Sequence, residues 1–202
     1  MILLAAALLA AQPAPAPAPP ATTAEAPKAD LVPVAIETSL GRIVVALDQG
    51  RAPVTTANFL RYVDTKRYDG QTFYRAMKND ADGGLIQGGV TSDARKLMAP
   101  IAHEPTSRTG LKHVAGALSM ARLTPGSAKA DFFILTTDIP GFDAGAPGGD
   151  ADGFAVFGQV VEGMDVVKAI YAAPTSPTKG EGVMKGQMLD PTVKIVKAAR
   201  VK

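Results

Sequence analysis

The residues of this sequence best suited to chemistry are an arginine and a glutamine on neighbouring apolar segments. Arg75 follows two aromatic residues, Phe73 and Tyr74, and Gln87 lies in the apolar, glycine-rich stretch 84–89. A guanidinium offers five N–H donors in a rigid plane and keeps its charge in proteins. A glutamine amide offers both a donor and an acceptor. Together the two side chains could hold a peptide group by hydrogen bonds, without a covalent intermediate.

Patterns for covalent or metal-dependent chemistry are weak in this chain. It contains no cysteine, no Gly-x-Ser-x-Gly motif and no glycine cluster followed by Gly-Lys-Ser or Gly-Lys-Thr. His103-Glu104 lacks a second histidine four residues after the first, and a metal shared by His103 and His113 is a weak alternative. We therefore expect no metal and no cofactor, and we expect any catalysis to rest on binding and electrostatics.

An aspartate-containing loop is the other place where a metal could be sought. Asp143, Asp150 and Asp152 lie in the Gly-rich and Pro-rich segment 138–153. The segment lacks the ligand spacing and the terminal glutamate of an EF-hand. We favour a solvated loop over a calcium site.

Length and charge limit the kind of protein that this chain can be. Its 202 residues predict one domain with additional segments, and a domain of about 150 residues buries enough surface to fold without disulfides. A net charge of +2 is too small to favour nucleic acid or a membrane surface as a partner. The absence of cysteine is compatible with an oxidising compartment.

The first 30 residues differ in composition from the rest of the chain. Residues 1–11 form an apolar run that is shorter than the roughly 20 residues of a membrane span and resembles a secretory signal. No Lys or Arg precedes this run, so a plain apolar tail is the alternative. Residues 12–30 are rich in proline and alanine and predict an extended linker. We expect the folded domain to occupy residues 31–202 and the protein to be periplasmic, with a cytoplasmic location as the alternative.

Many short apolar segments predict a mainly β domain. Predicted strands cover 34–39, 42–47, 72–74, 85–87, 117–121, 132–136, 154–160 and 192–196. One predicted helix opens at Ala52-Pro53, where proline suits the first turn, and a second covers 162–172. Segments 78–83, 122–131 and 138–153 are predicted loops. Many strands and two helices favour a closed barrel or a sandwich that the helices cap.

Several blocks in this order make the chain resemble the cyclophilin-type peptidyl-prolyl cis–trans isomerases, in particular their bacterial, often periplasmic branch. The resemblance runs from about Val34 to Val201 and rests on residues 55–59, 72–75, 86–89, 118–122, 131–134 and 154–167. It implies a closed eight-stranded antiparallel β-barrel capped by two α-helices. It also implies an enzyme that accelerates X–Pro isomerisation in exported proteins during folding, by a non-covalent mechanism and without a cofactor. We expect the protein to be a monomer. Its partners would be unfolded or flexible proline-containing polypeptides.

By position, the resemblance assigns roles to individual residues. Arg75 corresponds to the catalytic arginine, and Gln87 to the glutamine that orients the arginine and the substrate backbone. The implied walls of the proline pocket are Leu85, Phe133 and Phe142. The remaining implied substrate contacts are Tyr74, the backbone of Ala121 and Arg122, and the side chains of Asp131 and Phe154.

The chain also departs from the family pattern. Gly84-Leu85 stands where the family has Phe-Met, which predicts the loss of one aromatic wall, and Met77 is a candidate substitute. The connection 76–86 is about four residues longer than is usual in the family. Asp131 replaces a glutamine, and no tryptophan occurs near Gly141. These departures keep a second hypothesis open, in which the barrel binds peptides with little or no catalysis.

Overall fold

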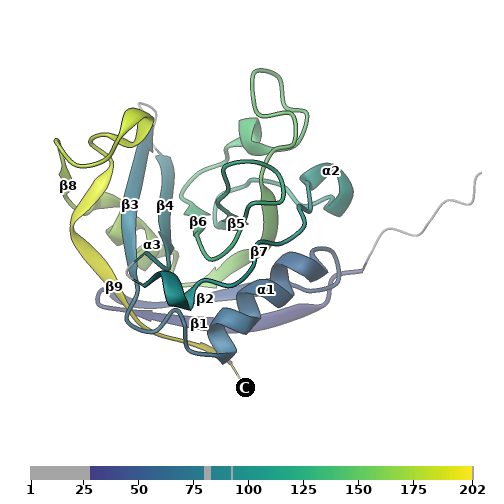
Figure 1. Ribbon diagram of the computed structural model, residues 1–202, viewed down its shortest axis with the longest axis horizontal. Helices are drawn as coiled ribbons and strands as arrows, with labels where there is room; N and C mark the ends of the chain where they lie inside the picture. Colours follow the sequence, from purple (N-terminus) through teal and green to yellow (C-terminus); the bar gives the residue numbers. More distant parts are fainter. Residues whose placement is uncertain (1–27, 80–82, 92, 202) are drawn as a thin grey trace, which may run out of the picture.

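The computed structural model describes residues 28–79, 83–91 and 93–201, and eight of its strands form a closed antiparallel barrel (Figure 1). The ring follows the order β1-β2-β7-β5-β6-β4-β3-β9, and β9 pairs with β1 to close it. A two-residue strand, β8 (Thr175–Ser176), pairs with β9 outside the ring. The predicted barrel is therefore confirmed. The ring strands are β1 (Leu31–Thr38), β2 (Gly41–Asp48), β3 (Thr72–Asn79), β4 (Gly83–Gly89), β5 (Ala117–Met120), β6 (Phe132–Leu135), β7 (Ala155–Glu162) and β9 (Met188–Arg200).

Three α-helices accompany the described strands, one more than the sequence predicted. Helices α1 (Pro53–Asp64) and α3 (Met164–Ala172) are the predicted pair, and each contributes buried apolar side chains to the barrel core. The third, α2 (Thr106–Thr109), has four residues and ends at Gly110, whose φ is +71°. A single turn is too short to show helical periodicity, so the sequence pattern could not reveal it. The described part of the chain also contains the short 3₁₀ turns η1 (Ala94–Lys96), η2 (Pro140–Phe142) and η3 (Gly182–Met184).

Helix α1 begins where the sequence predicted, but a distant residue caps it. Pro53 occupies the first turn, where its missing N–H costs no hydrogen bond. The buried Glu104 carboxylate accepts the backbone N–H groups of Val54 at 3.2 Å and Thr55 at 2.7 Å. A carboxylate at a helix N-terminus satisfies free donors and complements the helix dipole. Glu104 of the His103-Glu104 pair therefore has a structural role, because it caps the N-terminus of α1.

Three strands, β3, β4 and β9, extend further than the sequence predicted. The predicted loop 78–83 was too long, because Lys78 and Asn79 belong to β3 and Gly83 belongs to β4. Strand β9 covers 13 residues, whereas the apolar pattern marked only 192–196. In each of them, backbone pairing with neighbouring strands continues beyond the apolar residues. The length of these strands is therefore set by pairing within the barrel more than by local composition.

Side-chain alternation gives the sheet two apolar faces with different uses. Along β6, Phe132 and Ile134 lie in the main core inside the barrel. Phe133 and Leu135 belong to a second, smaller cluster on the other face. Successive side chains of a strand point to opposite faces, so a short apolar strand serves both. The second face is where the predicted site residues gather.

Candidate active site

Arg75, Gln87 and Phe133 form one row across three neighbouring strands. Arg75 in β3 pairs with Gln87 in β4, and Gln87 pairs with Phe133 in β6. Directly paired residues place their side chains next to one another on the same face. The paired Ile86 and Ile134 point into the barrel core instead. The barrel register therefore brings a charged donor, an amide and an aromatic ring together on its outer face.

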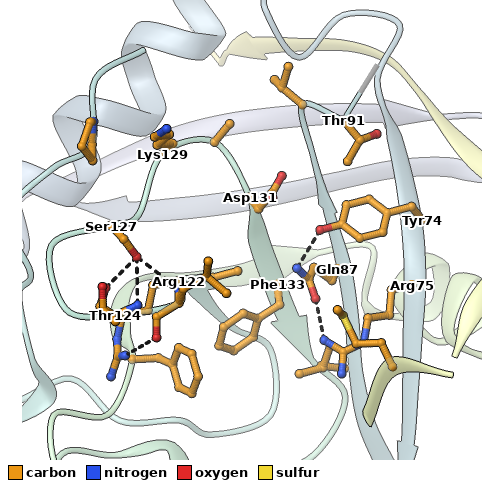
Figure 2. A pocket seen from close by; sticks show the side chains of 18 of the residues that line it. Tyr74, Arg75, Gln87, Thr91, Arg122, Thr124, Ser127, Lys129, Asp131 and Phe133 are labelled. Carbon is orange, nitrogen blue, oxygen red and sulfur yellow. Dashed lines mark hydrogen bonds between the residues drawn. The ribbon is translucent and has the colours of Figure 1, made fainter. Parts of the chain in front are cut away.

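A β-bulge at Tyr74 places two consecutive residues of β3 at this site. Phe73 pairs with Gly88, whereas Arg75 pairs with Gln87, so Tyr74 is the extra residue. Neighbouring side chains of a regular strand point to opposite faces, and a bulge breaks that alternation. Phe73 is buried in the core, while Tyr74 and Arg75 both line the groove. Figure 2 shows the two side chains on the same side of the strand.

Hydrogen bonds to two glutamines hold the arginine, and a tyrosine holds one of these glutamines. Arg75 donates from Nη1 to Gln87 Oε1 at 2.8 Å, and Gln87 donates from Nε2 to the Tyr74 hydroxyl at 2.7 Å (Figure 2). On its other side, Arg75 donates from Nε and Nη2 to Gln187 Oε1 at 2.8 and 2.7 Å. The bonds among the described residues use three of its five N–H groups. Two donors and the positive charge are left for a substrate.

The Asp131 carboxylate lies beside the Tyr74 hydroxyl. Burial raises the pKa of Asp131 from 3.8 to about 6, although hydrogen bonds from Tyr74 and the Val90 backbone act against that change. Among the described residues, its Oδ1 is buried without a hydrogen-bond partner. Burial and then the nearby Asp131 charge raise the pKa of Tyr74, so its hydroxyl stays protonated. Gly89 allows this close approach, because a Cβ there would collide with the Asp131 carboxylate.

Three phenylalanine rings form an aromatic wall of the groove. The centroid of Phe133 lies 5.8 Å from that of Phe142 and 5.5 Å from that of Phe154, with interplanar angles of 79° and 87°. Phe142 and Phe154 are 5.1 Å apart. Edge-to-face packing of this kind is favourable and holds the rings in defined orientations. Together they offer an apolar surface that could hold a proline ring.

The side chain of Arg122 supports this wall from behind. Its guanidinium lies 5.1 Å from the centroid of the Phe154 ring, and its Nε donates to the Gly153 carbonyl at 3.0 Å. The side chain is only 2% exposed, so it is poorly placed to reach a substrate. The Ala121 N–H donates to the Asp131 carbonyl at 2.9 Å. The Ala121 backbone group that a substrate could use is therefore its carbonyl oxygen.

A buried polar group lies directly behind Phe133. His113 is 2.8 Å from the Asp143 carboxylate through Nδ1 and 3.0 Å from the Ser119 hydroxyl through Nε2. Its ring stacks on Phe133 with an interplanar angle of 16°. Burial lowers the pKa of His113, although Asp143 acts in the opposite direction. Because Ser119 is fully buried, its hydroxyl cannot contact a substrate. The hydrogen-bonded His113 ring instead supports Phe133 from behind.

All ten sequence-predicted site residues line one groove of about 1040 Å³. These residues are Tyr74, Arg75, Leu85, Gln87, Ala121, Arg122, Asp131, Phe133, Phe142 and Phe154. The groove also includes apolar residues that the sequence reasoning did not place there, among them Val90, Leu97, Pro100, Leu123, Met184 and Met188. The described residues contain no cluster of three or more His, Cys, Asp or Glu side chains that could hold a metal ion.

Residues 33–199 match the sequence profile of the family described as "Cyclophilin type peptidyl-prolyl cis-trans isomerase/CLD". The chain belongs to the cyclophilin-type isomerase family. The enzyme class predicted from the sequence is thereby confirmed, and these findings do not support the alternative of a non-catalytic binding module.

Curated relatives of this cyclophilin cover most of its folded part. It is 39% identical over 150 residues to "Peptidyl-prolyl cis-trans isomerase cyp18" of Streptomyces antibioticus. The matched region covers 73% of this chain and 87% of the relative. It is 36% identical over 146 residues to "Peptidyl-prolyl cis-trans isomerase B" of Escherichia coli K12, with 70% and 85% covered. A solved cyclophilin-type isomerase of Cryptosporidium parvum superposes with a TM-score of 0.68 at 20% identity, covering 86% of this chain and 99% of that one. This last likeness supports the fold.

The structure changes the interpretation of Gly84 in this cyclophilin. Gly84 was expected to leave a gap in the groove wall, but a Cβ there would run into the Met77 carbonyl oxygen and approach the Tyr171 ring. Leu85 and Met77 are paired across β3 and β4 and pack in the same cluster as Phe133. In this backbone the wall next to Phe133 is therefore formed by Leu85 and Met77, and Gly84 faces away from it.

The predicted signal-like segment 1–11 and residues 12–27 of the predicted linker lie outside the described residues. No helix in the described part of the chain is long and apolar enough to cross a membrane.

Proposed function

We propose that this cyclophilin isomerises X–Pro bonds by using Arg75 as the catalytic cation and Gln87 to orient it. The observation that carries the proposal is the row formed by Arg75, Gln87 and Phe133 on paired strands. Phe133, Phe142, Leu85 and the adjoining Met77 side chain would hold the proline ring.

The reaction requires a planar amide to pass through a twisted state. Amide resonance imposes a barrier of about 18–20 kcal/mol, and uncatalysed exchange of an X–Pro bond takes tens to hundreds of seconds. When the bond twists, the prolyl nitrogen regains its lone pair and can accept a hydrogen bond. The two unused N–H groups of Arg75 are suited to that nitrogen, because they stabilise the twisted state more than either planar isomer. Catalysis then needs no acid, base or nucleophile.

The proposed role of Arg75 can be tested with one pair of arginine variants. Arg75→Ala is expected to lower kcat/KM for a proline peptide by at least about a hundredfold, which corresponds to about 2.7 kcal/mol of transition-state stabilisation. Arg61→Ala is the matched control, because Arg61 is exposed on α1 and does not line the groove. A protease-coupled assay or exchange spectroscopy gives the rate. Equal rates in wild type and Arg75→Ala would contradict the proposed role.

We also propose that the enzyme is a monomer exported to the periplasm, where it acts on proline-containing segments of proteins that are still folding. The apolar run 1–11 and the proline-rich segment that follows support export. The mass of the mature protein from a periplasmic extract tests this proposal. Loss of the apolar run is the expected result, and a full-length chain recovered from the cytoplasm would contradict it.

A further inference from the structure

Gln187 holds the side of Arg75 that faces away from Gln87. Its Oε1 accepts both Arg75 Nε, at 2.8 Å, and Arg75 Nη2, at 2.7 Å. Gln87 holds only Nη1. The guanidinium is therefore fixed on two edges, and two of its three bonds come from a residue 112 positions away in the chain.

The amide of Gln187 has only one orientation that satisfies its surroundings. Its Nε2 donates to the Val183 carbonyl at 2.8 Å, which turns the carbonyl oxygen towards Arg75. Its backbone is fixed as well, because the Ala76 N–H donates to the Gln187 carbonyl at 2.9 Å and the Gln187 N–H donates to Met184 O at 3.1 Å. Gln187 is thus tied both to η3 and to β3, the strand that carries the arginine.

An uncharged partner has a specific advantage at this position. No ion pair joins Arg75 to a carboxylate among the described residues, although the side chain is partly buried. A carboxylate in place of the amide would bind the same two N–H groups but would neutralise part of the positive field. An amide oxygen fixes the guanidinium and leaves its charge available to the developing lone pair.

We propose that Gln187 is a positioning residue for catalysis, a neutral anchor that presents the Arg75 guanidinium to the prolyl nitrogen. The inference rests on the proposed role of Arg75. Misplacing a catalytic group by about 1 Å can cost about a hundredfold in rate. Gln87 still holds one edge of the guanidinium when Gln187 is changed, so a loss of about tenfold in kcat is expected.

Three variants separate anchoring from other effects. Gln187→Met keeps the length and packing of the side chain but removes the amide, and it should lower kcat about tenfold with KM changed less than about twofold. Gln187→Glu keeps acceptors but adds a negative charge, and it should also lose kcat. Lys185→Ala is the matched control in the same loop, because Lys185 is exposed and does not line the groove. Circular dichroism melts establish that each variant is folded.

Two further measurements distinguish positioning from a structural role. In an Arg75→Ala background, Gln187→Met should have no further effect on kcat, because residues that act through one another are not additive. In ¹H–¹⁵N spectra, the Arg75 Nε–H should exchange slowly with solvent in wild type and in Lys185→Ala, and rapidly in Gln187→Met. This signal reports the Nε bond to Gln187 directly, independently of activity.

The outcomes separate this inference from the proposed function. An active wild type, an impaired Arg75→Ala and a fully active Gln187→Met would overturn the role of Gln187 alone. Full activity of Gln187→Glu would overturn the requirement for a neutral anchor. If wild type and Arg75→Ala were equally active, the proposed catalytic role of Arg75 would fail, and the positioning role of Gln187 would fail with it.

Discussion

Replacing Asp131 by asparagine is expected to stabilise the protein at neutral pH and to leave it unchanged in acid. Asp131 is largely buried beside the Tyr74 hydroxyl, and among the described residues its Oδ1 has no partner. Burying an ionised carboxylate without full compensation is unfavourable. Asparagine has the shape of the protonated acid and carries no charge. It keeps one oxygen to accept from Tyr74 and Val90.

The size of the effect follows from the pKa of Asp131. A folded-state pKa of about 6 against an ordinary value of 3.8 corresponds to about 3 kcal/mol, at 1.36 kcal/mol for each pKa unit. Because the folded protein binds this proton more tightly than the unfolded chain, stability falls as the pH rises from about 4 to 6. Above that range the full cost is present. We expect Asp131→Asn to gain up to about 3 kcal/mol at pH 7, because asparagine is neutral and does not carry this cost.

Urea unfolding of both proteins between pH 4 and pH 8 measures this difference. The free energy of unfolding of Asp131→Asn minus that of wild type should be near zero at pH 4 and should reach its maximum by pH 7. Asp152→Asn is the control, because Asp152 is exposed and its difference from wild type should stay small at every pH. A difference for Asp131→Asn that is independent of pH would refute the reasoning, because it would show that the burial of the charge is not its source.

Three other substitutions test the walls and the hydrogen-bond chain of the groove. Phe142→Ala should lower kcat/KM about tenfold in the protease-coupled assay, and a thermal melt should show that the variant remains folded, because Phe142 is only partly buried; an unchanged kcat/KM would remove Phe142 from the pocket. Tyr74→Phe removes the acceptor of the Gln87 amide and should lower kcat severalfold, whereas an increase in KM alone would indicate a contact with the substrate only. Gly84→Ala should cost about 1–3 kcal/mol in urea unfolding, since its Cβ would press on the Met77 carbonyl; wild-type stability would show that this strand can shift.

Local patterns in the sequence predicted most of the strands, and the resemblance to the cyclophilin-type isomerases predicted the closed barrel. Strand propensity, glycine-rich turns and Pro53 at the start of α1 are local signals, and each was readable within a few residues. The single turn of α2 and the outer parts of β3, β4 and β9 were missed. Those segments lack a periodic apolar pattern, and their conformation follows from hydrogen bonds to neighbouring strands and loops.

The sequence predicted which residues line the candidate site, but not how they are arranged. Resemblance to the cyclophilin blocks selected ten residues that line one groove. It could not show that Gly84 faces away from that groove, because the lengthened connection between Arg75 and Gln87 left the strand pairing there undetermined. Pairing of Met77 with Leu85 decides which side chains form the wall.

What the sequence alone determined is the chemistry available, namely a permanent cation, an amide and apolar rings with no nucleophile or metal motif. What only the tertiary structure decided is how that cation is held. The bulge that turns Tyr74 and Arg75 to one face arises from the pairing of β3 with its neighbours on both sides. The anchor Gln187 reaches Arg75 because β9 pairs with β3 in the closed barrel. Such contacts join segments far apart in the chain, so a local pattern of residue types cannot predict them.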